Sequence, residues 1–119
     1  MITGMLRLRS LSIFALFAVS CGLHAEGKHL FILSGQSNMA GLDPKLSFTP
    51  AVEKAFGADQ IIVVKDAQGG QPIHRWYKAW KSPEGEPVPN AGGLYARLMR
   101  KVHAATEGEE IDTVTLVWM

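Results

Sequence analysis

The sequence has 119 residues, in which 12 Lys and Arg stand against 11 Asp and Glu, and it contains one cysteine, Cys21. A single cysteine excludes an intramolecular disulfide and a cysteine-based metal cluster. The near-zero net charge gives no electrostatic footprint for nucleic acid, which favours a neutral ligand over a polyanion.

The first 25 residues have the pattern of a targeting segment. A basic region with two arginines precedes the apolar run 11–19, which is too short to span a bilayer. Cleavage after Ala25 suits ordinary signal peptidase, whereas residues 18–21 resemble a bacterial lipobox that would leave Cys21 as a lipid-bearing N-terminus. We favour Ala25, because a lipobox usually begins with a larger aliphatic residue. The sequence therefore predicts a signal peptide at 1–25 and an exported protein, periplasmic or secreted, whose mature chain has no transmembrane segment.

The first element of the mature chain is a strand that runs into a turn. Residues 30–33 are apolar without interruption, which predicts a short strand buried on both faces. Residues 34–38 are small or polar and favour a turn or a helix cap, and Gly41 is suited to end a short helix. Such a turn presents a nucleophile at the end of a strand, where helix N–H groups point toward a developing anion. Ser37 is thus a candidate nucleophile, and a serine that merely caps the helix is the alternative.

The next elements are a helix and a second strand. Residues 42–48 are expected to form a loop. Thr49-Pro50 predicts an N-cap and a proline at the first position of a helix that runs to about Phe56 and is closed by Gly57. Residues 60–65, with an apolar centre, predict a second buried strand.

Residues 66–93 form a long irregular segment that is too aromatic for disorder. Gly69-Gly70 follows the strand directly, so the backbone can approach a ligand there and turn an N–H toward it, although a plain turn is the alternative. Trp76 and Trp80 are four residues apart and would share one helical face. We expect this pair to pack on the core rather than to stack on a sugar ring.

The last elements are a helix and a strand. The helix is predicted over 94–106, and 113–119 predict a third strand. The helix carries an apolar stripe of Leu94, Leu98, Val102 and Ala105, widened by Tyr95 and Met99, with Arg97, Arg100 and Lys101 outside it. Strands that alternate with helices predict parallel βαβ units in an α/β sandwich. Because the sequence stops inside the third apolar run, we expect residues 26–119 to be the N-terminal part of a larger domain.

Three blocks of the sequence resemble the SGNH (GDSL-type) hydrolases. Residues 35–41, Gly-Gln-Ser-Asn-Met-Ala-Gly, are similar to the first block in the variant typical of sialate O-acetylesterases and acetylxylan esterases. Residues 69–76, Gly-Gly-Gln-Pro-Ile-His-Arg-Trp, resemble the second block. Residues 117–119 fit the opening of the third, Trp-x-Gln-Gly-Glu. Other serine and phosphate motifs do not match, since 35–39 lack the second glycine of a G-x-S-x-G elbow and no P-loop or dinucleotide motif occurs.

The resemblance implies a three-layer α/β/α sandwich with a parallel, flavodoxin-like sheet, of which only the N-terminal part is present. It implies an exported serine esterase that removes O-acetyl groups from a carbohydrate, with Ser37 as nucleophile and the N–H groups of Ser37 and Gly70 in the oxyanion hole. Gln71 stands where Thr or Ser is more usual and is a candidate substrate-binding residue. No metal or organic cofactor is implied.

The same resemblance places the catalytic histidine and its carboxylate, in an Asp-x-x-His motif, beyond Met119. The fragment alone is therefore expected to be inactive, with His74 as the one histidine in the expected cleft segment. Two alternatives stay open: a non-catalytic carbohydrate-binding relative that has lost the base, and an unrelated α/β domain whose Gly-Gln-Ser-Asn turn is structural. The sequence leaves the oligomeric state open.

Overall fold

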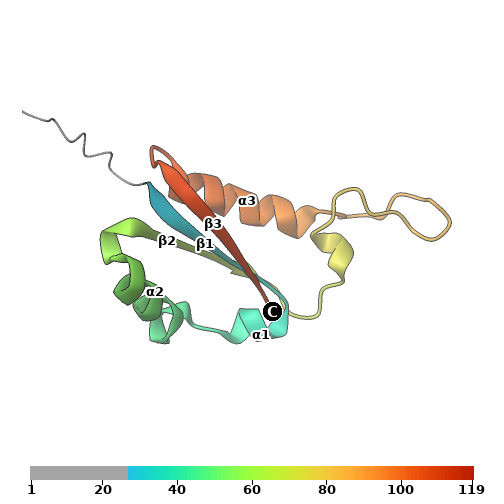
Figure 1. Cartoon of the computed structure of the whole chain (residues 1–119). Helices are drawn as coiled ribbons and strands as arrows, with labels where there is room; N and C mark the ends of the chain where they lie inside the picture. Colours follow the sequence, from blue (N-terminus) through green and yellow to red (C-terminus); the bar gives the residue numbers. More distant parts are fainter. Residues whose placement is uncertain (1–26) are drawn as a thin grey trace, which may run out of the picture.

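The structure is a computed structural model that describes residues 27–119. The expected signal peptide and Cys21 lie outside the described residues. The described chain forms a small α/β domain with a three-stranded parallel sheet in the order β2-β1-β3 (Figure 1). Its elements are β1 (Lys28–Gly35), α1 (Ser37–Gly41), α2 (Phe48–Phe56), β2 (Ile61–Ala67), α3 (Gly93–Thr106) and β3 (Ile111–Trp118), with 3-10 turns at Pro44–Leu46, Ala58–Gln60 and Ile73–Arg75.

The central strand β1 sets the register of the whole sheet. It pairs with β2 from His29↔Ile61 to Gly35↔Ala67, and with β3 as far as Ser34↔Trp118. Because all three strands are parallel, their carboxyl ends meet at one edge of the sheet. The residues that follow β1 and β2 are thereby brought together, as a parallel α/β arrangement predicts.

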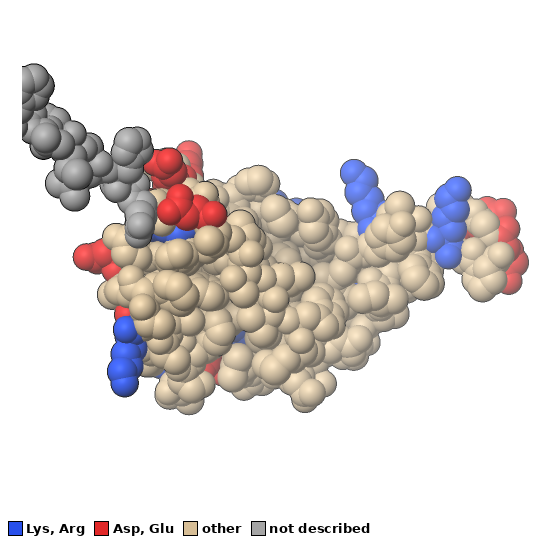
Figure 2. Space-filling view, viewed as in Figure 1, with Lys and Arg blue, Asp and Glu red and all other residues tan. Residues whose placement is uncertain are grey.

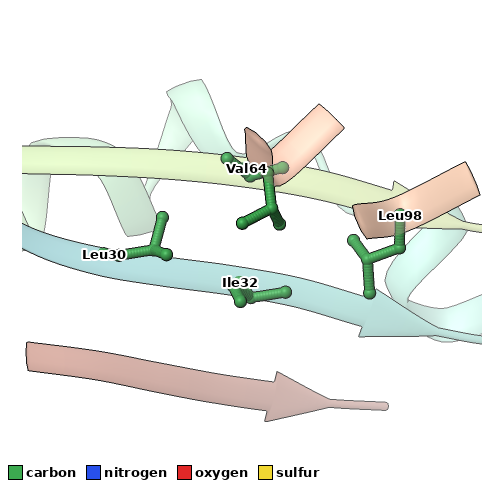
Figure 3. Close-up of a cluster of buried hydrophobic side chains, with 5 residues drawn as sticks. Leu30, Ile32, Val64 and Leu98 are labelled. Atoms are coloured by element: carbon green, nitrogen blue, oxygen red, sulfur yellow. The ribbon is translucent and has the colours of Figure 1, made fainter. Parts of the chain in front are cut away.

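Helices pack on both faces of the sheet, over β1 and β2. On one face, side chains of α3 pack on alternate residues of β1 and β2, forming the core cluster of Leu30, Ile32, Val64, Leu98 and Val102 (Figure 3). On the other face, Phe31 meets Phe48 and Phe56 of α2, with ring centroids 5.6 and 5.8 Å apart. The three layers are those of an α/β sandwich.

Helix α2 begins earlier than the sequence indicated. Its N-cap is Ser47 rather than Thr49, and the carbonyl of Ser47 accepts the first helical hydrogen bond. An earlier start places Phe48 on the buried side against Phe31, and Pro50 still fits because N–H groups of the first turn have no helical partner. The predicted end at Phe56 is confirmed.

The apolar stripe of α3 is narrower than predicted. Leu94, Leu98 and Val102 are buried, but Ala105 is exposed and Tyr95 is 48 % exposed. The buried contact is therefore made by the central residues of the stripe, on β1 and β2, together with the partly buried Met99.

The prediction that Trp76 and Trp80 share one helical face is wrong. The 3-10 turn Ile73–Arg75 ends just before Trp76 and no helix spans 76–80, so the two rings do not share a face. Trp76 is half-buried and meets Trp118 edge-on at 5.0 Å between centroids, whereas Trp80 is 40 % exposed beside Tyr77. Only Trp76 therefore packs on the sheet. Residues 81–90 form a loop that projects from the body of the molecule (Figure 1).

Candidate functional site

The turn between β1 and α1 presents Ser37 to solvent. Gly35 has a φ of +137°, and a Cβ added there would lie 2.0 Å from the carbonyl oxygen of Met119, so the position requires glycine. The N–H of Gln36 donates to that same oxygen at 2.7 Å, which ties the turn to the end of β3. Ser37 follows as an exposed residue at the carboxyl edge of the sheet.

Ser37 occupies the first helical position of α1 and not its cap. The N-cap is Gln36, whose side chain makes no capping hydrogen bond. Met39 is fully buried and anchors the short helix, and Lys65 of β2 donates from Nζ to the carbonyl oxygens of Ala40 and Leu42 at its end. The helix is thus held at both ends, while the serine at its start stays accessible.

The two glycines after β2 have different surroundings, and only Gly69 is in contact with Ser37. A Cβ on Gly69 would lie 3.4 Å from both Cα and Cβ of Ser37, so these two residues are in contact. Gly70 has a φ of +68°, and a Cβ there would meet no atom within 4 Å. Gly69 therefore allows close packing, while Gly70 supplies the left-handed backbone beside open space.

The side chain of Gln71, the candidate substrate-binding residue, is engaged within its own loop. Its Oε1 accepts from Arg75 Nη1 at 2.8 Å, and the residue is half-buried. This bond spans the 3-10 turn at Ile73–Arg75. The side-chain amide nitrogen of Gln71 is the other polar group of this residue's side chain.

A charged residue that sequence reasoning missed lies beside the glycine turn. Asp66 is 6 % exposed and accepts from Arg97 Nε at 2.8 Å and from Lys101 Nζ at 2.7 Å. Burial alone would raise the pKa of Asp66, but the hydrogen bonds and charges of Arg97 and Lys101 outweigh it and hold the pKa below its ordinary value. Two features of the sequence could have indicated it. An acidic residue continues the alternate positions of Ile62 and Val64 in the strand, and Arg97 and Lys101 are four residues apart on the helix, so they lie on the same side of it.

The described histidines are not joined to Ser37. His29 lies near the other end of β1, where Nδ1 and Thr113 Oγ1 are 2.7 Å apart. His103 is exposed on the C-terminal half of α3, and His74 belongs to the 3-10 turn after the glycines. Within residues 27–119, no histidine is hydrogen-bonded to Ser37, and no group of three His, Cys, Asp or Glu side chains has the placement to hold a metal ion.

Two surface pockets lie away from Ser37. One, of about 330 Å³, is lined by Trp76, Tyr77, Lys78, Ala79 and Tyr95. The other, of about 290 Å³, lies between α2 and β2 and is lined by Pro44, Lys45, Thr49, Glu53, Ala58, Ile61, Val63 and Lys65. In the part of the chain that the structure covers, no helix has the length and apolar character to cross a membrane.

Comparisons with protein-family models, with curated proteins and with solved structures found no match for this chain. The interpretation of function therefore depends on the sequence motifs and on the geometry around Ser37.

Proposed function

We propose that this chain is part of an exported serine esterase of the SGNH type, which removes O-acetyl groups from a carbohydrate through an acyl-enzyme on Ser37. One observation carries the proposal. Ser37 is exposed at the first turn of α1, in contact with Gly69 of the Gly69-Gly70 turn, at the carboxyl edge of a parallel sheet. This is the place where α/β folds bind their ligands.

In the proposed reaction, Ser37 Oγ attacks the carbonyl carbon of the acetyl ester and gives its proton to a general base. The N–H groups of Ser37 and Gly70 stabilise the oxyanion of the tetrahedral intermediate, and each such donor is typically worth about 3 kcal/mol of barrier. Collapse of the intermediate breaks the ester C–O bond, and the sugar hydroxyl leaves with the proton from the base. Water then hydrolyses the acetyl-serine by the same steps and releases acetate.

The proposal assigns the base to a histidine outside the described residues. His29 and His103 are placed away from the carboxyl edge of the sheet, and His74, in the 3-10 turn after the glycines, makes no hydrogen bond to Ser37. Asp66 is unsuited to orient a histidine, because both of its oxygens already accept from Arg97 and Lys101. The expected position, in an Asp-x-x-His motif beyond Met119, is part of this proposal.

A non-catalytic carbohydrate-binding protein is the second candidate. It is favoured by the pocket lined by Trp76, Tyr77 and Tyr95, because aromatic faces stack on sugar rings. In that case Ser37 would have no function as a nucleophile.

Substitution of Ser37 separates the two. In the complete protein, we expect Ser37→Ala to lower hydrolysis of O-acetylated sialic acid or acetylated xylan by about 10⁴-fold or more, with the free energy of unfolding changed by less than about 0.5 kcal/mol. A fluorophosphonate should label the wild type at Ser37. Ser47→Ala is the matched control, because Ser47 is also exposed at a helix start and makes no side-chain capping bond. Undiminished turnover in Ser37→Ala, or labelling at another serine, would contradict the proposal.

A further inference from the structure

The ion pair between α3 and the end of β2 lies next to the turn that contacts Ser37. Asp66 occupies a position on the α3-facing side of β2, where Ile62 and Val64 precede it. The carboxylate of Asp66 is buried, but Arg97 and Lys101 are partly exposed, and ion pairs that reach solvent contribute little stability, so stability alone does not explain this arrangement. An arginine fork does restrict geometry, because it binds its acceptors in a narrow range of orientations.

Arg97 extends the pair toward the candidate site, and Lys101 does not. Besides its bond to Asp66, Arg97 donates from Nη1 to Gln68 Oε1 at 2.9 Å. Lys101 Nζ instead lies 3.5 Å from the carbonyl oxygen of Lys65, which precedes Asp66 in the strand. Both cations therefore bind Asp66. Arg97 also binds Gln68, which follows Asp66 in the sequence, whereas Lys101 lies near Lys65, which precedes it.

Gln68 connects Arg97 to the turn between β1 and α1 and to the Gly69-Gly70 turn. Its backbone N–H donates to the carbonyl oxygen of Gly35 at 3.1 Å, on the turn that leads to Ser37. Its neighbour is Gly69, which is in contact with Ser37. Two hydrogen bonds of Gln68, one from Arg97 to its side chain and one from its own N–H to Gly35, thus connect α3 to the nucleophile turn.

We propose that Arg97 is a positioning residue, which fixes the Gly69-Gly70 turn against Ser37 by holding the side chain of Gln68. Its effect on catalysis rests on the proposed function, because Gly70 then supplies an oxyanion donor. The placement of the turn, however, can be measured without any activity.

Three variants separate positioning from simple stabilisation. Arg97→Lys keeps the positive charge beside Asp66 but cannot supply forked donors to both Asp66 and Gln68. Gln68→Met removes the acceptor at similar size. Lys101→Gln is the matched control, since it removes the other bond to Asp66 and leaves Arg97 on Gln68.

The first measurement is ¹⁵N relaxation of the full chain. Gly69 and Gly70 should have backbone order parameters of about 0.85 in the wild type and in Lys101→Gln. In Arg97→Lys and Gln68→Met these order parameters should fall below about 0.6. The double variant of Arg97 and Gln68 should be no more mobile than either single one, because both remove the same bond. Equal order parameters in Arg97→Lys and Lys101→Gln would overturn the proposal.

The second measurement is hydrolysis of an acetylated xylo-oligosaccharide by the complete protein, which contains the proposed general base. Arg97→Lys and Gln68→Met should each lower kcat by about ten- to a hundredfold with KM within about twofold, and Lys101→Gln should leave kcat within about twofold. A kcat loss in Lys101→Gln as large as that in Arg97→Lys would overturn the proposal. A wild type without Ser37-dependent hydrolysis would overturn the proposed function instead, and the order parameters would then decide the role of Arg97 by themselves.

Discussion

Two polar side chains near the same edge of the sheet have opposite environments. Ser37 is exposed and lies on a turn, whereas Asp66 is buried and paired with two cations. A reactive group has to meet a ligand, while a group that holds neighbouring elements in place is best shielded from water. The difference in burial therefore matches the role proposed for Ser37 as nucleophile and the position of Asp66 as the carboxylate that holds Arg97.

The low pKa of Asp66 predicts a stability that depends on pH. A carboxyl group whose pKa is lower in the folded than in the unfolded state contributes stability above its unfolded value, about 3.9, and loses it as the pH falls through its folded value. Asp66→Asn should lower the free energy of unfolding by about 1–3 kcal/mol at pH 7, since its partners are partly exposed.

The difference between wild type and Asp66→Asn should shrink as the pH falls below about 4. Urea unfolding at pH 7, 5 and 3 measures it. Asp112→Asn is a suitable control, because Asp112 is exposed on β3 and takes part in none of the ion pairs among residues 27–119. A difference that stays constant down to pH 3 would show that the charge of Asp66 is not the source of its contribution.

At the scale of elements, the site depends on the turn between β1 and α1. Gly35 contacts the end of β3 so closely that the turn and the third strand form one unit. The Gly69-Gly70 turn packs on the same unit from the side of β2. Three strand ends therefore have to be in place before Ser37 is positioned.

Gly35→Ala should be strongly destabilising. The added Cβ would lie 2.0 Å from a backbone oxygen, and the φ of +137° is unfavourable for alanine. We expect a loss of about 3 kcal/mol or more in the free energy of unfolding, together with loss of Ser37 labelling. Gly41→Ala, where a Cβ meets no atom within 4 Å, should be neutral or slightly stabilising. Similar thermal melting of the two variants would contradict this account of the turn.

At the scale of the whole molecule, the sheet is covered unevenly. Val114 and Leu116 of β3 pair with Leu30 and Ile32, so they lie on the face that α3 covers elsewhere, yet each is 62 % exposed. The side of the molecule on which β3 lies in front carries few charged side chains in its middle (Figure 2). Parallel sheets normally have both faces buried, so this apolar area is unusual for the fold.

The uneven cover predicts unequal effects of apolar substitutions. Leu98→Ala, in the core, should lower the free energy of unfolding by about 2–5 kcal/mol. Val114→Thr and Leu116→Thr should each change it by less than about 0.5 kcal/mol, because the side chains bury little surface. Urea unfolding of the three variants measures these differences. A loss above about 2 kcal/mol in Leu116→Thr would show that this face is covered in solution.

Much of the fold could be predicted because its signals are local. The apolar runs at 30–33 and 61–64 lie in strands, although the second strand begins at Ile61 and not at Gln60. The spacing of Leu94, Leu98 and Val102 marked the buried side of α3. The break after the first run placed Ser37 at the start of a helix. Each of these patterns depends on the period of a single element and on turn chemistry, which are properties of neighbouring residues.

Other features depend on which elements face one another. The strand order β2-β1-β3 brings Gly69 to Ser37, and the position of α3 over β1 and β2 leaves Ala105 and Tyr95 exposed. Arg97, assigned by sequence to the outer side of its helix, instead forms the link between Asp66 and Gln68. The sequence by itself thus determined the elements and the residue types at their ends. Only the tertiary structure decided which charges pair and which apolar side chains are buried, because both depend on contacts between residues far apart in the chain.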